Sequence, residues 1–452
     1  MTVEVVKQIE PLKITVAFTP QEIKEGIRVY TLQGYFREDE GLAPYPAPAT
    51  ILNDVVNIWR LTDDLALIEY PNRVDVASLR SFSVVYTLNY YQIKTAIGIT
   101  DTSFGLIGKD LSNQDKAVAV LTDVNYSSWT IRESTGDPAK AISSAILSGR
   151  LFLLLPNNNI LYSTPSFYND LLTGADPFDF TRGAGFFALD SANIGSARFL
   201  VPYLNALYVL GSPSYSALIT IGNISGASFS DMGITVNYFY GGVSIPFDAF
   251  GFANNIVAIS PDGIFVIRGY TVERLKGIMG YLQNEPIVGG GYFYSAGYKG
   301  FVVSNASKSF AYLEDTGQWA TYPIVFKKVF TLFSRTFGLT PAGQLMELFP
   351  SNSSFLPIWY EAHIPVDATY IRVKDIKIYG QDIGTNLDVG VLDINGAYRT
   401  PVLRRADRNY VWFTFPSAVK SNRLYVKLVI NNPSNTTRLR SLEVDCYASN
   451  VK

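Results

Sequence analysis

A long succession of short apolar runs, each closed by turn-forming residues, constrains the fold of this chain more than any other feature of its sequence. Such runs occupy residues 151–155, 207–210 and 264–267, and turns such as Pro261-Asp262-Gly263 separate them. The runs have the length of β-strands, and a turn signal roughly every 8–12 residues is typical of a sandwich, a barrel or a propeller. We therefore predict an all-β fold.

Residues 55–362 also show a second, longer and less regular repeat. A strand–turn–strand unit recurs with a period of about 40–50 residues, which is the spacing of four-stranded propeller blades. We predict a β-propeller over residues 55–362, with one short helix over residues 272–282 because four apolar side chains there fall on one helical face. Gly289-Gly290-Gly291 is expected to form a hinge or a tight connection.

The two ends of the chain follow different patterns. Residues 1–54 contain one alternating segment at residues 12–18, which predicts a strand, and a proline-rich stretch at residues 41–48, which predicts a stiff arm that links domains or docks on a neighbour. Residues 363–452 contain five alternating segments and predict a small C-terminal antiparallel β-sandwich. The expected units are therefore an N-terminal strand and arm (1–54), a β-propeller (55–362) and a β-sandwich (363–452).

The charge balance and the aromatic content narrow the function. Lys and Arg number 37 against 39 Asp and Glu, so the formal net charge is −2. Charged residues make up 17% of the chain and aromatic residues 14%, whereas an ordinary soluble domain has roughly 25% charged residues. This balance argues against a disordered chain and against tight electrostatic binding of nucleic acid. The aromatic residues are either buried against other subunits or hidden inside a large propeller or sandwich.

The single cysteine, Cys446, excludes an intramolecular disulfide and is typical of a chain that assembles in a reducing compartment. The first ten residues lack the apolar stretch of a signal peptide, and no window reaches the length of a transmembrane helix. We therefore expect no membrane span and assembly in the cytoplasm.

Few residues of the sequence are suited to catalysis. One histidine, His363, and one cysteine are too few for a His/Cys zinc site, and no nucleophile elbow, Walker A motif or dinucleotide fingerprint occurs. We interpret His363 as a packed or exposed residue between two domains. The sequence predicts no catalytic, metal-binding or cofactor-binding residue and no cofactor, so the protein is not expected to be an enzyme.

Acidic pairs could still support glycoside hydrolysis. The pairs lie at Glu38-Asp39-Glu40, Asp63-Asp64 and Glu314-Asp315. Residues 313–319 are similar to the Asp-box of sialidase propellers, but Leu313 replaces the usual serine and one residue is missing before Trp319. We favour a hairpin turn at residues 315–317 with Trp319 packed between blades. A sialidase-like or carbohydrate-binding propeller stays open as the alternative function, although the arginine triad and Tyr–Glu pair of a sialidase are not recognisable.

Basic residues gather in one place near the C-terminus. The set comprises Arg399, Arg404, Arg405 and Arg408, with Arg438 and Arg440 on the last predicted strand. Such a cluster fits a solvated loop or a contact with an acidic protein better than a contact with DNA phosphates, and both interpretations remain possible.

One passage is more specific than these motifs. Residues 233–270, and within them the phrase from Asn255 to Gly269, resemble the central blades of the β-propeller tail proteins of short-tailed bacteriophages, known as tail nozzle, tail accessory or packaged-DNA stabilisation proteins. The preceding Gly-apolar-Ser-Pro phrase is altered, because Ile245 separates Ser244 from Pro246. Two further phrases resemble blades of the same family in the same order: residues 159–163 with Phe167, and residues 311–313 followed by residues 317–319. The resemblance covers residues 150–447.

This resemblance implies a structural virion protein at the distal end of the head-to-tail conduit of a phage tail. It implies a homo-oligomeric ring, a hexamer in the best-known members, in contact with portal–adaptor proteins and with tail fibre or needle proteins. Double-stranded DNA would pass through the ring at ejection without sequence-specific binding. A near-neutral chain suits such a conduit, because phosphates that meet few fixed cations are not held tightly.

Overall fold

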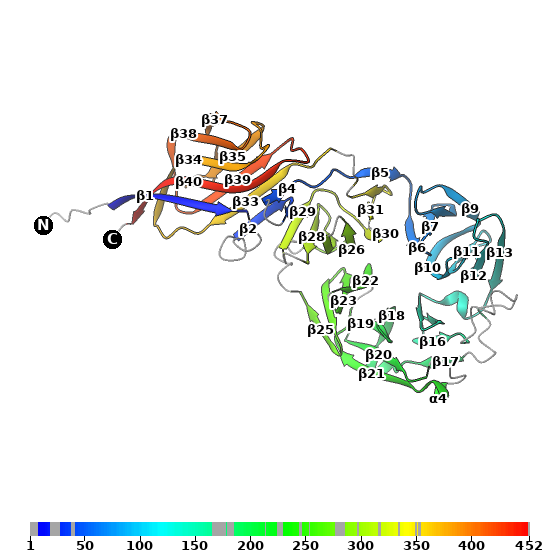
Figure 1. Ribbon diagram of the computed structural model, residues 1–452. Helices are drawn as coiled ribbons and strands as arrows, with labels where there is room; N and C mark the ends of the chain where they lie inside the picture. Colours follow the sequence, from blue (N-terminus) through cyan, green and yellow to red (C-terminus); the bar gives the residue numbers. More distant parts are fainter. Residues whose placement is uncertain are drawn as a thin grey trace.

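Figure 1 shows the computed structural model of the chain, which is almost entirely β-structure, so the expected all-β fold is confirmed. The short helices are η1 (Pro138–Lys140), α3 (Ser191–Ile194) and α4 (Phe229–Met232). None of the helices within the described residues is long and apolar enough to cross a membrane. The structure describes residues 8–18, 28–37, 41–164, 178, 185–212, 214–223, 229–243, 246–252, 254–275, 285–295, 298–314, 318–332, 335–348, 350 and 354–450.

Seven four-stranded blades form a β-propeller in the described part of the chain, and neighbouring strands within each blade are antiparallel. Blade 1 contains β6 (Asn57–Arg60), β7 (Leu65–Tyr70), β8 (Arg73–Ser78) and β9 (Val84–Leu88). Blade 2 contains β10 (Tyr90–Thr100), β11 (Ser103–Asp110), β12 (Asp115–Thr122) and β13 (Trp129–Ser134). Blade 3 contains β14 (Ser143–Leu147), β15 (Arg150–Leu154), β16 (Asn159–Tyr162) and β17 (Gly185–Ala188). Blade 4 contains β18 (Ser196–Tyr203), β19 (Ala206–Ser212), β20 (Tyr215–Ile221) and β21 (Ile234–Tyr240).

The remaining blades follow the same order from the axis outward. Blade 5 contains β22 (Asp248–Phe252), β23 (Asn255–Ser260), β24 (Gly263–Arg268) and β25 (Thr271–Arg274). Blade 6 contains β26 (Gly289–Ser295), β27 (Tyr298–Ser304), β28 (Ser309–Leu313) and β29 (Gln318–Tyr322). Blade 7 contains β30 (Lys328–Leu332), β31 (Arg335–Leu339), β32 (Leu345–Glu347) and, from the N-terminal side of the propeller, β5 (Ala49–Leu52).

Buried apolar clusters between neighbouring blades close the propeller into a ring. Seven such clusters occur among the described residues, one at each interface between blades. The cluster that joins the last blade to the first contains Phe337 of β31 and Ile68 of β7. Strand β5 pairs with β32, so a strand from before the propeller completes its last blade. The alternating short runs of the sequence therefore supply the faces that pack between blades.

Three consecutive glycines let two blades approach each other. Gly289-Gly290-Gly291 was expected to be a hinge or connection, but these residues begin the innermost strand of blade 6. Gly290 pairs with Lys328 in a parallel bridge, so the innermost strands of blades 6 and 7 are joined. A Cβ atom on Gly291 would lie 1.9 Å from the carbonyl oxygen of Val329, a distance that no side chain tolerates. The glycines are needed for this close backbone contact.

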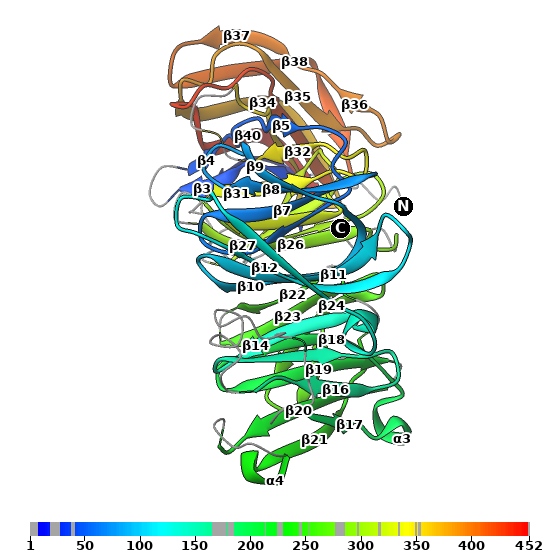
Figure 2. The same cartoon turned by 90° about the vertical axis from the view of Figure 1, so that its right-hand side faces the viewer.

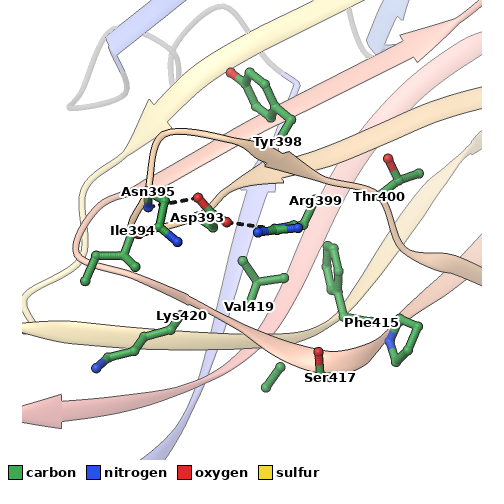
Figure 3. A pocket seen from close by; sticks show the side chains of 12 residues that line it. Asp393, Ile394, Asn395, Tyr398, Arg399, Thr400, Phe415, Ser417, Val419 and Lys420 are labelled. Carbon is green, nitrogen blue, oxygen red and sulfur yellow. Dashed lines mark hydrogen bonds and ion pairs between the residues drawn. The ribbon is translucent and has the colours of Figure 1, made fainter.

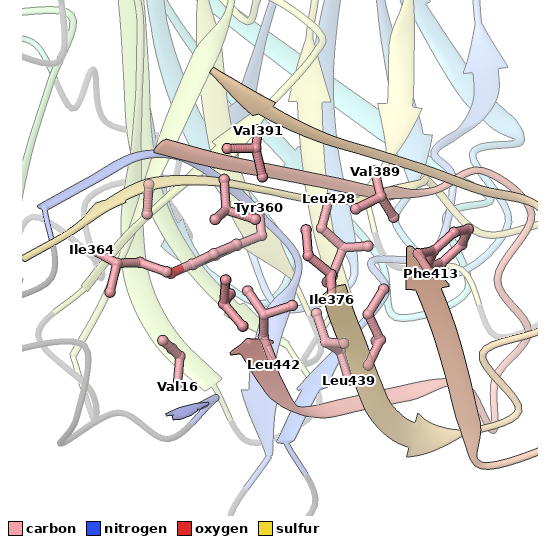
Figure 4. Packing of buried hydrophobic residues seen from close by; sticks show 14 of the residues in the cluster. Val16, Tyr360, Ile364, Ile376, Val389, Val391, Phe413, Leu428, Leu439 and Leu442 are labelled. Carbon is pink, nitrogen blue, oxygen red and sulfur yellow. The ribbon is translucent and has the colours of Figure 1, made fainter. Parts of the chain in front are cut away.

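The second domain is a β-sandwich of two sheets, which lies beside blades 6 and 7 (Figures 1 and 2). The seven-stranded sheet contains β1 (Gln8–Ala17), β3 (Tyr35–Arg37), β4 (Gly41–Ala43), β34 (Tyr370–Gln381), β37 (Val402–Ala406), β38 (Tyr410–Ser421) and β40 (Arg438–Asn450). The five-stranded sheet contains β2 (Arg28–Gln33), β33 (Ile358–Ile364), β35 (Leu387–Leu392), β36 (Tyr398–Arg399) and β39 (Leu424–Ile430). Ile376, Leu428 and Leu442 belong to the apolar core between the two sheets (Figure 4).

The sheets divide the chain differently from the expected units. Residues 1–54 do not form a separate unit, because β1 pairs with β40, β2 pairs with β33, and β5 belongs to blade 7. Strand β33 begins at Ile358, so the sandwich starts before the expected boundary at residue 363. The propeller is therefore inserted into the sandwich, and the chain enters and leaves through the sandwich. The pairings of β1 with β40 and of β2 with β33 join residues more than 300 positions apart, which a local sequence pattern does not reveal.

The helix expected over residues 272–282 is not formed at its start. Thr271–Arg274 form β25, the outermost strand of blade 5, which pairs with β24. Blade 5 needs a fourth strand to cover β24, and this tertiary requirement outweighs the helical spacing of the apolar residues. Residues 276–282 lie outside the described residues.

Candidate functional site

The residues considered for catalysis do not come together. His363 lies on β33, where its ring is 4.9 Å from the ring of Tyr425 on β39. Cys446 is buried on β40 in the other sheet of the sandwich, and burial raises the pKa of its thiol to about 11. Among the described residues, no group of three or more His, Cys, Asp or Glu side chains could hold a metal ion.

The acidic pair Asp63-Asp64 lies on the surface of the propeller and is paired with arginines, whereas Glu314 is half-buried and its backbone N–H donates a hydrogen bond to the carbonyl of Lys299. Asp63 forms an ion pair with Arg60, and Asp64 Oδ1 lies 3.1 Å from Arg80 Nε. Residues 38–40 and the turn at residues 315–317 lie outside the described residues. Trp319 packs as expected in the cluster between blades 5 and 6, with its ring 5.5 Å from that of Phe301.

The C-terminal arginines do not form one basic patch. Arg399 lies on β36 of the five-stranded sheet, whereas Arg404 and Arg405 lie on β37 of the other sheet. Arg405 lies 3.7 Å from Asp407, and Arg408 is ion-paired with Asp382. The side chain of Arg438 is buried and donates hydrogen bonds to the carbonyls of Asn435 and Thr437, while Arg440 and Arg404 are exposed. Neighbouring carboxylates thus neutralise much of the charge that could attract phosphates.

Polar side chains gather where the innermost strands of three blades begin. Lys328 starts β30, Asn57 starts β6 and Asp248 starts β22. Lys328 Nζ lies 3.3 Å from Asn57 Oδ1 and donates to the carbonyl of Ile58, so this side chain links blade 7 to blade 1. Asp248 accepts a hydrogen bond of 2.9 Å from the backbone N–H of Ala249. We name Asn57, Asp248 and Lys328 the axial cluster.

Burial shifts the pKa values of two members of the axial cluster, Asp248 and Lys328. Desolvation raises the pKa of Asp248 to about 6, and the charge of Lys328 opposes this shift. Desolvation likewise lowers the pKa of Lys328 to about 8, and Asp248 opposes that shift. Shifted pKa values of this kind also occur at catalytic sites. In this protein the ammonium group of Lys328 is hydrogen-bonded to blade 1, so the axial cluster connects the last blade of the propeller to the first.

Three tyrosine side chains are exposed on blades 4 and 5. Tyr215, Tyr240 and Tyr270 are 37%, 77% and 54% exposed. The rings of Tyr215 and Tyr240 are 5.7 Å apart in an edge-to-face arrangement, and the ring of Tyr270 lies 6.3 Å from that of the buried Phe239. We call these three residues the tyrosine patch. Exposed tyrosine rings of this kind are typical of protein contacts.

Other large apolar side chains are also exposed on blades 2, 3 and 4. They include Leu111, Val124, Phe186 and Leu204. The aromatic content of the sequence is consistent with contacts to other subunits, but it identifies none of these positions. The alternation of residues in a strand predicts which side chains share a face of a blade. It does not predict the exposure of Tyr270, because that depends on how blade 5 packs against blade 4. The axial cluster was missed for the same reason, since its members come from three distant segments.

No protein-family model matches the sequence, and no curated protein matches it either. Solved structures match in shape only. BamB from Moraxella catarrhalis is 11% identical, with a TM-score of 0.40, over 76% of this chain and 98% of that one. The extracellular domain of the one component system BT4673 from B. thetaiotaomicron is 11% identical, with a TM-score of 0.45, over 81% of this chain and 47% of that one. BBS1N in complex with ARL6DN is 9% identical, with a TM-score of 0.41, over 72% of this chain and 99% of that one.

Proposed function

We propose that this protein is a structural subunit of a phage tail, a nozzle that closes the portal–adaptor channel and lets double-stranded DNA pass at ejection. In this proposal the chain forms a homo-oligomeric ring in the virion, assembled in the host cytoplasm, with portal–adaptor and tail fibre or needle proteins as neighbours. The observation that carries the proposal is the tyrosine patch, which leaves aromatic surface exposed after the propeller has closed. Exposed aromatic surface of this kind is typical of a site that contacts another protein.

The position of the resembling segment is consistent with this proposal. The phrase from Asn255 to Gly269 covers β23, β24 and the turn between them in blade 5. Blade 5 also carries Tyr270 of the tyrosine patch, directly after this phrase. The resembling phrase is therefore followed directly by one member of the tyrosine patch, while the other two lie on the neighbouring blade 4.

The charge distribution also suits a conduit. The formal net charge is −2, and of the arginines near the C-terminus three, Arg399, Arg405 and Arg408, have carboxylates as neighbours while Arg438 lies buried. Because the affinity for DNA grows with the number of phosphates that are neutralised, a surface of this kind lets DNA slide.

The assembly state of the purified chain tests the proposal. We expect ring-shaped oligomers by analytical ultracentrifugation and electron microscopy, either of the chain alone or on a portal–adaptor template. Tyr240→Asp and Tyr270→Asp should shift the chain to monomers, because each places a charge on the apolar contact surface. Tyr447→Asp, on an exposed site of β40 in the sandwich, is the matched control and should still assemble. A chain that stays monomeric with and without the template would contradict the proposal.

A further inference from the structure

A groove in the sandwich has the features of a ligand site. It lies between the β35–β36 hairpin of one sheet and β38 of the other, and its volume is about 640 Å³. Figure 3 shows Arg399 between Asp393 and Phe415, with Lys420 and Ile394 at one end and Thr400 and Ser417 at the other. A pocket of a few hundred cubic ångströms with convergent polar groups is typical of small-ligand sites.

A bulge in β38 opens the groove. Thr414 pairs with Asp375 and Val419 pairs with Val373, so the four residues between them on β38 face one residue, Lys374, on β34. Of these four, residues 416–418 are exposed, while Phe415 is buried like Val419 after the bulge, and both line the floor. A bulge of this kind redirects side chains and ends regular pairing.

Both ends of the groove are closed by the chain itself. At one end the backbone N–H of Ile394 donates a hydrogen bond of 2.9 Å to the carbonyl of Lys420, which ties the hairpin to β38. At the other end the chain passes through Thr400 and Pro401 from β36 in one sheet to β37 in the other. A groove with two closed ends fits a compact group rather than a peptide strand that runs through it.

Arg399 is held in a fixed position in the groove. Its Nε lies 2.7 Å from Oδ2 of Asp393, whose carboxylate is buried and also accepts hydrogen bonds of 2.9 and 3.0 Å from the backbone N–H groups of Asn395 and Ala397. These backbone bonds, followed by the guanidinium, hold the pKa of Asp393 below its usual value. Arg399 contacts Asp393 through Nε, and among the described residues no hydrogen bond is found for its two terminal amino groups.

A second cation, Lys420, lies at the end of the groove that is closed by Ile394. Lys420 is exposed, and its ammonium lies 4.9 Å from the centre of the Tyr370 ring. Arg399 and Lys420 together outweigh the single carboxylate of Asp393, so the groove carries a net positive charge. The amide of Asn395 and the hydroxyls of Thr400 and Ser417 add hydrogen-bonding groups at the rim.

We propose that this groove binds a carboxylate-bearing sugar unit of a glycan, such as a uronic or sialic acid. The terminal amino groups of Arg399 match a carboxylate in two parallel hydrogen bonds, and Lys420 adds a second positive charge. The rim amide and hydroxyls suit sugar hydroxyls, and the apolar floor of Phe415 and Val419 suits the C–H face of a sugar ring. The inference needs only the geometry of the groove and does not rest on the nozzle proposal.

Titration calorimetry with the full chain tests the inference. The probes are glucuronic acid and N-acetylneuraminic acid, with glucose and galactose as neutral sugars, and with acetate and poly-glutamate as carboxylates without a sugar. We expect the acidic sugars to bind at least tenfold more tightly than every other probe. If the neutral sugars bind as tightly as the acidic sugars, the cations do not recognise the ligand. If acetate or poly-glutamate binds as tightly as the acidic sugars or more tightly, the groove recognises a carboxylate without a sugar, which would contradict the proposal. No binding of any probe would overturn the site.

Variants locate the binding in the groove. Arg399→Gln should weaken binding of the acidic sugars roughly 10- to 100-fold, because it removes charge-assisted hydrogen bonds. Lys420→Gln removes a cation without disturbing the buried Asp393, so it keeps the test valid if Arg399→Gln fails to fold. The matched control is Arg404→Gln on β37, which is exposed and outside the groove lining, and it should bind like the unchanged protein. Unchanged binding in Lys420→Gln and in a folded Arg399→Gln would overturn the inference.

Discussion

At the turn between β23 and β24, Gly263 has a φ of +150°, a conformation that side chains other than glycine rarely adopt. A Cβ atom there would lie 2.6 Å from Nε of Arg274. We predict that Gly263→Val lowers the free energy of unfolding by about 1–3 kcal/mol, measured by urea denaturation. The exposed neighbour provides the comparison, since Asp262→Asn should leave stability and assembly unchanged. Equal stability of the two variants would contradict the role given to Gly263.

The contact between blades 6 and 7 depends on Gly291 in a different way. Its missing side chain, rather than its backbone angle, admits the carbonyl of Val329. We predict that Gly291→Ala destabilises the protein by about 1–3 kcal/mol or more, because a backbone atom cannot move aside as a flexible side chain can. Gly222→Ala is the control, since its Cβ would meet nothing closer than 3.6 Å. Thermal unfolding should show a lower melting temperature for Gly291→Ala than for Gly222→Ala. Equal melting temperatures would mean that the close contact with Val329 is not what requires the glycine.

The raised pKa of Asp248, about 6, predicts a dependence of stability on pH. Between the ordinary aspartate pKa of about 4 and pH 6, the folded state holds a proton that the unfolded state has lost. Stability therefore falls as the pH rises through this window, and it falls no further from Asp248 above it. Asp248→Asn lacks this contribution, so it should gain stability relative to the unchanged protein between pH 4 and 6. Parallel stability curves for the two proteins over this range would contradict the assignment.

At the scale of elements, the pairing of β5 with β32 closes the propeller. Met346 and Thr50 are partners across these strands, so a disulfide between cysteines at the two positions would fix the closure. We predict that the oxidised double variant Thr50→Cys, Met346→Cys melts at a higher temperature than its reduced form, because the bond restricts the unfolded chain over a long loop. Thr50→Cys alone should show no such difference. Failure of the disulfide to form would mean that β5 does not complete blade 7.

Local elements could be predicted from the sequence where the pattern is local. The alternating residues 12–18 predicted a strand, and β1 (Gln8–Ala17) covers most of them. The phrase around Pro261-Asp262-Gly263 predicted the hairpin of β23 and β24. The helix over residues 272–282 was wrong at its start, because β25 is required as the outer strand of its blade. The helical spacing of the apolar residues in this segment carries no information about the need for a fourth strand in blade 5.

At the scale of the whole molecule, the all-β fold followed from the rhythm of runs and turns, but the path of the chain did not. The pairing of β1 with β40 and of β2 with β33 joins the two ends of the sequence, and no local pattern marks it. The groove was missed for a related reason. Arg399 was considered only as one of a run of arginines, whereas the bulge after Thr414 and the anchoring of Arg399 by Asp393 depend on the three-dimensional arrangement of the strands.

Quantitative mass spectrometry of purified phage particles, made by cells that carry this gene, shows whether the chain is a virion subunit. We predict that the chain is present in every particle preparation, in several copies per portal ring and at a constant ratio to the adaptor protein, as a subunit of a tail ring must be. Absence of the chain from infectious particles, or a trace amount that varies between preparations, would contradict the assignment to a tail nozzle.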